Sequence, residues 1–397
     1  MKVLMIGWEF PPYLVGGLGT HVYNLSINLV RSGVDLSLFA FKPAGSKKIE
    51  NVEGIKVFRF AYPEMLACCG RRSEIIIENE LFSLNILKNI EKTLRLIGCP
   101  DILHVHDWMG ASLGLVLKEI FQIPLVTTLH VTSKELERLY PLGIYGNLAE
   151  KERLLTVKSD RIICCSKAMV NEVKGHYEIN PEKIVLIPNG VEIETFQRPS
   201  FNNSELSLKH NSGEKAILFV GRLVFEKGIL NLIKALPLII EQIPQAHLLI
   251  CGKGYLEKKI KEEILRLHIE DKVLLTGFVN RQELADYYAL ADVAIFPSLY
   301  EPFGIVVLEA LATKTPVVVS NVGGLMDIIR DGLNGLKVQP GDYEDIARKA
   351  ILLLKNESYA RKLAEQGYQD VINSKNWEQI ARETKMVYEE IVRESIC

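Results

Sequence analysis

Short, strongly apolar runs alternate with helical patterns along most of this chain. In the first half, we expect strands at residues 2–6, 34–39, 55–60, 102–106, 124–129, 161–164 and 184–187. Apolar residues fill these runs without alternating with polar ones, which is typical of parallel strands buried on both faces. A strand–helix series of this kind predicts a doubly wound parallel sheet, and therefore an α/β fold.

The series breaks at a polar stretch rich in Asn and Ser and then starts again. In the second half, expected strands lie at residues 216–220, 247–251, 273–275, 293–296 and 316–320. We expect four parts: an N-terminal domain at 1–191, a linker at 192–214, a second α/β domain at 215–373 and a C-terminal helix at 374–397 that packs back toward the N-terminal domain. Because ligands of such sheets bind beyond the carboxyl ends of the strands, the site is expected in a cleft between the two domains.

Composition excludes several classes of protein. Hydrophobic residues make up 48% of the chain, and 47 basic residues against 49 acidic ones leave a net charge of −2. A protein held to nucleic acid by phosphate contacts normally carries a basic excess, so nucleic acid is not an expected partner. No apolar run approaches the roughly 18 residues of a spanning helix. The run at residues 3–6 is too short for the core of a signal peptide, so we expect a cytoplasmic protein.

Two cations follow the first strand of the second half, in the segment Gly221-Arg222-Leu-Val-Phe-Glu-Lys227-Gly228. Arginine binds phosphate oxygens through a forked contact, and lysine acts as a point charge. With glycines on both sides and a helix to follow, the pair is suited to clamp a diphosphate. The alternative is a solvated basic turn.

Two glutamates, Glu301 and Glu309, are separated by seven residues. A continuous helix would hold their carboxylates about 12 Å apart, too far for a dyad that shares a proton. Pro302 and Gly304 instead indicate a helix that begins between them, with one carboxylate ahead of it and one inside it. With its N-terminal amides, this arrangement is suited to hold a nucleotide sugar by the sugar hydroxyls, the diphosphate and the ribose hydroxyls.

Polar residues also end two neighbouring strands of the first half. His104, His106 and Asp107 close one of them, and His130 closes the next. For the first strand, contact with a substrate is favoured, and buried structural polar groups are the alternative. His130, taken alone, is more often a structural residue. No further ligand set of matching spacing accompanies them, so no metal site is expected.

The diphosphate charge must be met without an obvious metal chelator. No two aspartates stand in D-x-D spacing anywhere in the chain. Arg222, Lys227 and helix ends are then the expected partners of the diphosphate. The loop that holds Gly16 and Gly17 before the first helix also suits a phosphate, although a tight turn is an equal alternative.

Together these motifs resemble the retaining glycosyltransferases of the GT-B fold, in family 4 and the related glycogen and starch synthases. The resemblance covers nearly the whole chain and rests on Gly16-Gly17-Leu18, residues 104–108, His130, Pro188-Asn189-Gly190, Arg222 with Lys227-Gly228, Glu301 with Glu309, and Gly323-Gly324. The two glutamates combined with the Arg/Lys pair are its most specific part. The resemblance implies two Rossmann-like domains facing each other across a cleft, the first for the acceptor and the second for the nucleotide-sugar donor.

The resemblance also implies roles for individual residues. The catalytic set would be His130, Arg222, Lys227, Glu301 and Asp107, and the donor-binding set would be Gly17, Val279, Gly304, Ile305, Val306 and Glu309. Arg222 and Lys227 would stabilise the leaving diphosphate, together with the amides of Gly17, Ile305 and Val306. Glu309 would bind the ribose, and Val279 would lie by the base. Glu301 and His130, and with them Asp107, would lie near the transferred sugar.

By this resemblance, a hexosyl unit moves with retention from an ADP-, UDP- or GDP-hexose to a sugar or glycan acceptor, giving an α-linkage. The nucleotide sugar is a co-substrate, and neither a cofactor nor a metal is implied. We favour glucosyl transfer, because residues 106–108 and 301–304 resemble glycogen synthases. Short loops at 61–73 and 131–148 would shape the acceptor site.

Other functions remain as alternatives. One is mannosyl or other hexosyl transfer to a lipid-linked or small-molecule acceptor. Two belong to different classes: epimerisation of a nucleotide sugar, and sugar binding without catalysis. The segment at 71–95 carries basic and apolar residues, but its packing on the parent sheet is favoured over contact with a membrane surface.

Overall fold

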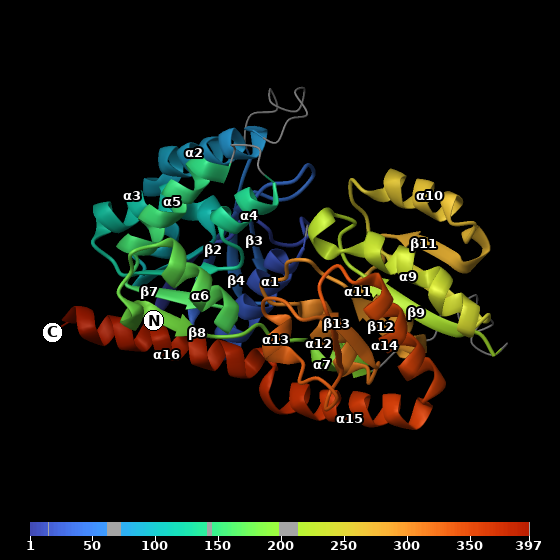
Figure 1. Cartoon of the computed structure of the whole chain (residues 1–397). Helices are drawn as coiled ribbons and strands as arrows, with labels where there is room; N and C mark the ends of the chain where they lie inside the picture. Colours follow the sequence, from blue (N-terminus) through green and yellow to red (C-terminus); the bar gives the residue numbers. More distant parts are fainter. Residues whose placement is uncertain (15, 62–72, 141–144, 198–212, 397) are drawn as a thin grey trace. The chain divides into compact units, whose positions relative to one another are not determined.

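The chain forms two compact units, described by a computed structural model that covers residues 1–14, 16–61, 73–140, 145–197 and 213–396. Unit 1 comprises Met1–Asn189 and Trp377–Cys397, and unit 2 comprises Gly190–Asn376 (Figure 1). Each unit is built around its own sheet. Among the described helices, none combines the length and the apolar character that a membrane span requires.

The sheet of unit 1 has eight strands in the order β3-β4-β2-β1-β5-β6-β7-β8. They are β1 (Lys2–Ile6), β2 (Asp35–Phe41), β3 (Ile49–Val52), β4 (Ile55–Phe60), β5 (Ile102–His106), β6 (Leu125–Leu129), β7 (Arg161–Cys164) and β8 (Ile184–Leu186). All neighbours pair in parallel except β3 and β4, which are antiparallel. The strand order reverses between β1 and β5, which makes their carboxyl ends the topological switch point of the sheet.

Helices cover both faces of this sheet. They are α1 (Gly17–Arg31), α2 (Ser73–Ile97), α3 (Ala111–Phe121), α4 (Ser133–Leu139), α5 (Tyr145–Lys158), α6 (Lys167–His176) and α16 (Trp377–Ile396). Helices α1 and α16 pack together over one core cluster, and α2, α3 and α5 pack over a second. In α2, Phe82 and Ile86 are fully buried in that second core. Two basic residues of the segment at 71–95, Arg71 and Arg72, lie outside the residues that the structure describes.

Unit 2 has a six-stranded parallel sheet in the order β11-β10-β9-β12-β13-β14. Its strands are β9 (Lys215–Val220), β10 (Ala246–Cys251), β11 (Val273–Gly277), β12 (Val293–Phe296), β13 (Val317–Ser320) and β14 (Leu336–Val338). Its helices are α7 (Ile193–Gln197), α9 (Ile229–Gln242), α10 (Glu257–Arg266), α11 (Arg281–Leu290), α12 (Ile305–Ala312), α13 (Leu325–Ile328), α14 (Tyr343–Lys355) and α15 (Glu357–Ser374). The order reverses between β9 and β12, so this sheet too has a switch point at a carboxyl edge.

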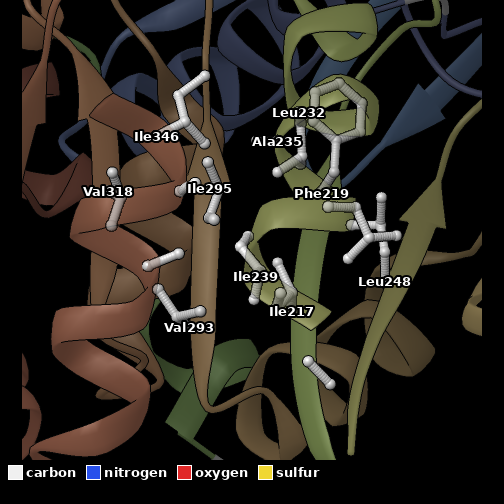
Figure 2. Packing of buried hydrophobic residues seen from close by; sticks show 14 of the residues in the cluster. Ile217, Phe219, Leu232, Ala235, Ile239, Leu248, Val293, Ile295, Val318 and Ile346 are labelled. Carbon is white, nitrogen blue, oxygen red and sulfur yellow. The ribbon is translucent and has the colours of Figure 1, made fainter. Parts of the chain in front are cut away.

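The core of unit 2 explains why its central strands are mostly apolar and do not alternate with polar residues. Ile217 and Phe219 of β9 point toward α9, where they meet Leu232 and Ile239 (Figure 2). Leu218 lies between them in sequence, faces the opposite side of the strand and is also fully buried. Helices therefore cover both faces of the strand, and the predicted doubly wound α/β architecture is confirmed in both units.

The structure contains several local elements that were not expected. Strands β3 and β14 lie at sheet edges and were not expected. Residues 193–197 of the expected linker form α7, whose Phe196 is buried against the ring of Tyr288. The stretch 131–148, expected as a loop, contains α4 and the start of α5. The other loop expected to shape an acceptor site, at 61–73, falls almost entirely outside the described residues.

Candidate active site

In unit 2, the loop after β9 packs closely against the loop after β12. Gly228 has a φ of 66°, and a Cβ built on it would lie 1.9 Å from the carbonyl oxygen of Pro297. Only glycine fits such an approach. The backbone N–H groups of Leu299 and Tyr300 donate to the carbonyl of Glu226, at 2.8 and 3.3 Å. These contacts hold the two loops together at the switch point of the sheet.

This packing brings together two of the predicted site residues. The Nζ of Lys227 lies 2.6 Å from Oε2 of Glu301, and their side chains are 19% and 8% exposed. The hydroxyl of Ser298 donates to the same carboxylate oxygen at 3.1 Å. The structure therefore joins the loops after β9 and β12 through a largely buried ion pair.

Arg222 occupies a different position in the same loop. Its guanidinium lies 3.3 Å from Oε1 of Glu226, and its side chain is 51% exposed, whereas that of Glu226 is 9% exposed. Glu226 was not among the sequence-predicted residues. Since it offers one buried carboxylate to a half-exposed cation, it orients Arg222 while leaving donors of the guanidinium to solvent.

The predicted helix start is close to the observed one. Gly304, with a φ of 106°, caps α12, which begins at Ile305. The first amides of a helix have no intrahelical acceptor, so those of Ile305 and Val306 are available to an anion. The turn after β13 packs on the same segment: a Cβ on Gly323 would lie 1.9 Å from the carbonyl oxygen of Glu301, and Gly324 donates its N–H to that oxygen.

Glu309 lies inside α12, where it is buried between two residues that the sequence did not single out. Tyr288 donates its hydroxyl to Oε2 at 3.3 Å, and the Arg281 guanidinium lies 3.6 Å from Oε1. Burial raises the pKa of Glu309 to about 7, although Arg281 and the Tyr288 hydroxyl oppose this. Arg281 also pairs with Glu192 at 3.5 Å. Val279, which is half-buried, lies between β11 and α11.

In unit 1, a carboxylate from the loop after β1, that of Glu9, lies at the start of α1. Oε2 of Glu9 accepts the backbone N–H groups of Gly16 and Gly19, each at 3.1 Å. Gly17 is the first residue of the helix. A phosphate bound at this turn would share the glycine amides with the Glu9 carboxylate.

The histidines after β5 and β6 divide into two groups. His104 is fully buried and bonded on both ring nitrogens, to the Tyr388 hydroxyl at 2.6 Å and the Thr128 hydroxyl at 2.7 Å. This satisfied side chain is structural. His106 instead contacts His130, with Nδ1 of the first 3.1 Å from Nε2 of the second. Burial holds the pKa of both His106 and His130 well below the ordinary value, so the two rings are neutral near pH 7.

Asp107 acts on His130 through the backbone. It has a φ of 55°, and its Oδ1 accepts the backbone N–H of His130 at 2.6 Å. Burial raises the pKa of Asp107 well above its ordinary value, against the effect of hydrogen bonds from the backbone of His130 and Val131. A buried carboxyl engaged in this way positions His130 rather than presenting a charge to a substrate.

Comparison with known proteins identifies the family of the chain. Residues 15–195 match the model for glycosyltransferase family 4, and residues 201–370 match the model for glycosyl transferases group 1. An uncharacterized glycosyltransferase of Methanocaldococcus jannaschii is 34% identical, covering 98% of each chain. A glycogen synthase of Mycobacterium tuberculosis is 29% identical over 98% of this chain and 94% of its own.

Solved structures share the fold. Sucrose-phosphate synthase from Thermosynechococcus elongatus superposes with a TM-score of 0.87 at 24% identity, covering 99% of both chains. Anabaena HepE in complex with UDP-glucose does so with a TM-score of 0.75 at 20% identity, covering 98% of this chain and all of its own. These matches confirm the GT-B fold and the resemblance stated from the motifs. The chain belongs to glycosyltransferase family 4 and is a retaining hexosyltransferase that takes its sugar from a nucleotide-sugar donor.

Proposed function

We propose that this enzyme transfers a glucosyl unit from a nucleoside-diphosphate glucose to a sugar or glycan acceptor, without a metal ion, and forms an α-linkage. The observation that carries the proposal is the Lys227–Glu301 pair at the switch point of unit 2. A cation suited to a diphosphate and a carboxylate suited to sugar hydroxyls stand there side by side, where a parallel sheet binds its ligand.

In this proposal, the donor binds along the carboxyl edge of the unit 2 sheet. Lys227 and Arg222 hold the diphosphate, and the amides of Ile305 and Val306, after the Gly304 cap, add to the anion site. Glu301 accepts hydrogen bonds from hydroxyls of the transferred sugar. Farther along α12, Glu309 binds the ribose hydroxyls, and Val279 lies beside the base.

In unit 1, two further residues are proposed to contact the donor. His130, neutral and held by Asp107, accepts or donates a hydrogen bond at a sugar hydroxyl near the reacting carbon. Gly17 offers its amide to the diphosphate. Asp107 keeps its place in the proposal as a positioning residue, because its carboxyl is bonded to the backbone of His130.

The proposed mechanism replaces one bond on a single face of the sugar. The bond between the anomeric carbon and the diphosphate oxygen breaks, and a bond from the acceptor oxygen forms on the same side. The acceptor proton passes to the departing diphosphate. Lys227 and Arg222 stabilise the charge that develops on this leaving group, which supplies the main catalytic effect.

The choice of glucose is supported by the relatives. One of them is named a glycogen synthase, and a solved structure of the same fold holds UDP-glucose. Neither observation selects the base of the donor. The partners that we propose are therefore an ADP-, UDP- or GDP-glucose and a sugar acceptor, with mannosyl transfer as the second candidate.

Donor turnover tests the proposal. The enzyme is incubated with ADP-, UDP- and GDP-linked glucose and mannose, with and without a panel of sugar acceptors, and release of nucleoside diphosphate is followed. We expect the fastest release with a glucose donor and an acceptor. Turnover of a mannose donor alone would contradict the glucosyl assignment, and isomerised donor without an acceptor would indicate an epimerase. The same release assay is run on the Lys227→Ala variant. Lys258→Ala, on the exposed face of α10, is its matched control.

A further inference from the structure

Three histidines from distant parts of the chain meet in unit 1 beside the carboxyl ends of β5 and β6. His21 comes from α1, His106 ends β5 and His130 follows β6. One ring nitrogen of each lies within 4.8 Å of a ring nitrogen of the other two. We call these three residues the histidine cluster. The sequence did not single out His21, so the cluster emerges only from the fold.

Two ring nitrogens of the cluster have no hydrogen-bond partner within the described residues. Nε2 of His21 and Nε2 of His106 are both buried in this state. A buried polar atom without a partner is costly, since it has lost its bond to water and gained nothing in return. The unpartnered Nε2 of His21 therefore indicates a group that the protein itself does not supply. His106 faces His130 with its other nitrogen, Nδ1, so the Nε2 of His106 is not a ligand candidate.

The hydrogen bond on the other side of His21 prepares it to bind a metal. Its Nδ1 lies 2.6 Å from Oδ1 of Asn189, an oxygen that only accepts hydrogen bonds. The ring proton therefore resides on Nδ1, and Nε2 keeps a lone pair that can bind a metal. Fixing a histidine tautomer from the second nitrogen is what outer ligands do in metal sites.

The spacing fits a tetrahedral ion. With Zn–N bonds of 2.0–2.1 Å, two nitrogens of a tetrahedral site lie about 3.3 Å apart. The nitrogens of His106 and His130 that contact each other are already 3.1 Å apart. Reducing the remaining separations from at most 4.8 Å requires shifts of about 1.5 Å or less. His130 is only partly buried, so one of the three ligand residues remains in contact with solvent.

The protonation state of the cluster is also the one that metals need. Burial lowers the pKa of His21 to about 4 and the pKa of His106 and His130 well below the ordinary value. Neutral imidazole is the form that binds a metal, and three imidazoles suit zinc and its first-row neighbours rather than magnesium or calcium.

We infer that the histidine cluster binds one Zn²⁺ ion, with His21, His106 and His130 as ligands and Asn189 as the outer partner of His21. Bound zinc inhibits sugar transfer, because it fixes the ring of His130, on which the proposed contact with the sugar depends, against His21 and His106. The binding stands on the cluster alone, whereas the inhibition rests on the proposed function of His130. Transfer itself remains independent of metals, and zinc acts as a regulator.

Titration of the full-length protein tests the binding. Zn²⁺ is followed by calorimetry, and Co²⁺ by the visible absorption of a tetrahedral site. We expect one ion per chain, a rise in the melting temperature of about 5 °C at 100-fold excess over Kd, and affinity reduced by roughly 10–100-fold or more in His21→Gln and His106→Gln. His247→Gln, in unit 2, is the control and should bind like the wild type. Melting curves of the metal-free variants show that they fold.

The outcomes separate the two parts of the inference. The zinc site would be overturned if the titration shows no zinc bound at one ion per chain. It would also be overturned if wild type, His21→Gln and His106→Gln bind zinc with equal affinity. Zinc that binds through these residues, inhibits transfer and is reversed by EDTA supports both parts. Zinc that binds but leaves transfer unchanged would overturn the inhibition and count against the role of His130, while the site would stand.

Discussion

Replacement of Lys227 by Met removes the charge that joins the two loops of the proposed donor site. In the wild type, Lys227 Nζ lies 2.6 Å from a Glu301 oxygen, and both side chains are largely buried. Methionine keeps an unbranched apolar stem in place of the lysine stem and so limits the loss of packing. The substitution therefore affects two quantities, the charge available to the leaving diphosphate and the neutralisation of Glu301.

The two effects have different magnitudes. A hydrogen bond to a charged group contributes about 1.5–3 kcal/mol, which corresponds to a fall in kcat of roughly 10- to 150-fold. Breaking a buried pair by removing one partner costs about 3–5 kcal/mol. Lys227 is 19% exposed and Ser298 still donates to Glu301, so we expect a smaller loss of folding free energy, about 1–3 kcal/mol.

Steady-state release of nucleoside diphosphate measures the first effect, and thermal unfolding measures the second. Lys258→Met, with a side chain 90% exposed, should change neither. The double variant Lys227→Met/Glu301→Gln removes both charges and should recover most of the stability while transfer stays slow. A wild-type rate in Lys227→Met would refute the donor assignment, and it would leave the pair with a purely structural role even if stability fell.

Further consequences of the site can be measured separately. Transfer should persist in excess EDTA, because Arg222 and Lys227 meet the diphosphate charge; activity that is lost and then restored by magnesium would contradict this. The raised pKa of Glu309, about 7 against 4.5 for an ordinary carboxyl, makes its contribution to stability greatest below pH 4.5 and removes it as the pH rises toward 7. Glu309→Gln should therefore lose less stability than the wild type over that interval in chemical denaturation. Proton NMR of the first product should show an α-anomeric signal from an α-linked donor, and a β signal would refute same-face transfer.

The sequence predicts the sheets better than their edges, for a physical reason. Strands such as β9 and β12 are covered on both faces, so residues 216–220 and 293–296 are all apolar and the runs are recognisable. Edge strands lack that signature: β3 reads IENV, and β14 has only three residues with a lysine in the middle. Helix α7 escapes notice because it has five residues within a polar stretch and is held by the burial of Phe196.

The site is predictable only where it follows strand ends. Lys227 and Glu301 follow neighbouring strands of one sheet, so their meeting is foreseeable from strand order. Arg281 and Tyr288, which surround Glu309, come from a helix whose sequence carries no motif. His21 lies within an ordinary helical pattern, and only the packing of α1 brings it to His106 and His130. Such contacts depend on tertiary packing, which local sequence patterns do not encode.

Backbone packing, rather than side-chain length, sets the geometry of the proposed donor site. Gly228 against Pro297 and Gly323 against Glu301 leave no room for a Cβ, so the turns after β9, β12 and β13 are fixed in direct contact. A lysine and a glutamate on such turns meet with little conformational freedom left to lose, which keeps the charge in place before a substrate arrives. In unit 1, by contrast, the backbone N–H of His130 donates a hydrogen bond to Asp107. The ring of His130 lies next to the rings of His21 and His106. The proposed zinc ion therefore binds to the ring of His130 and not to Lys227 or Arg222.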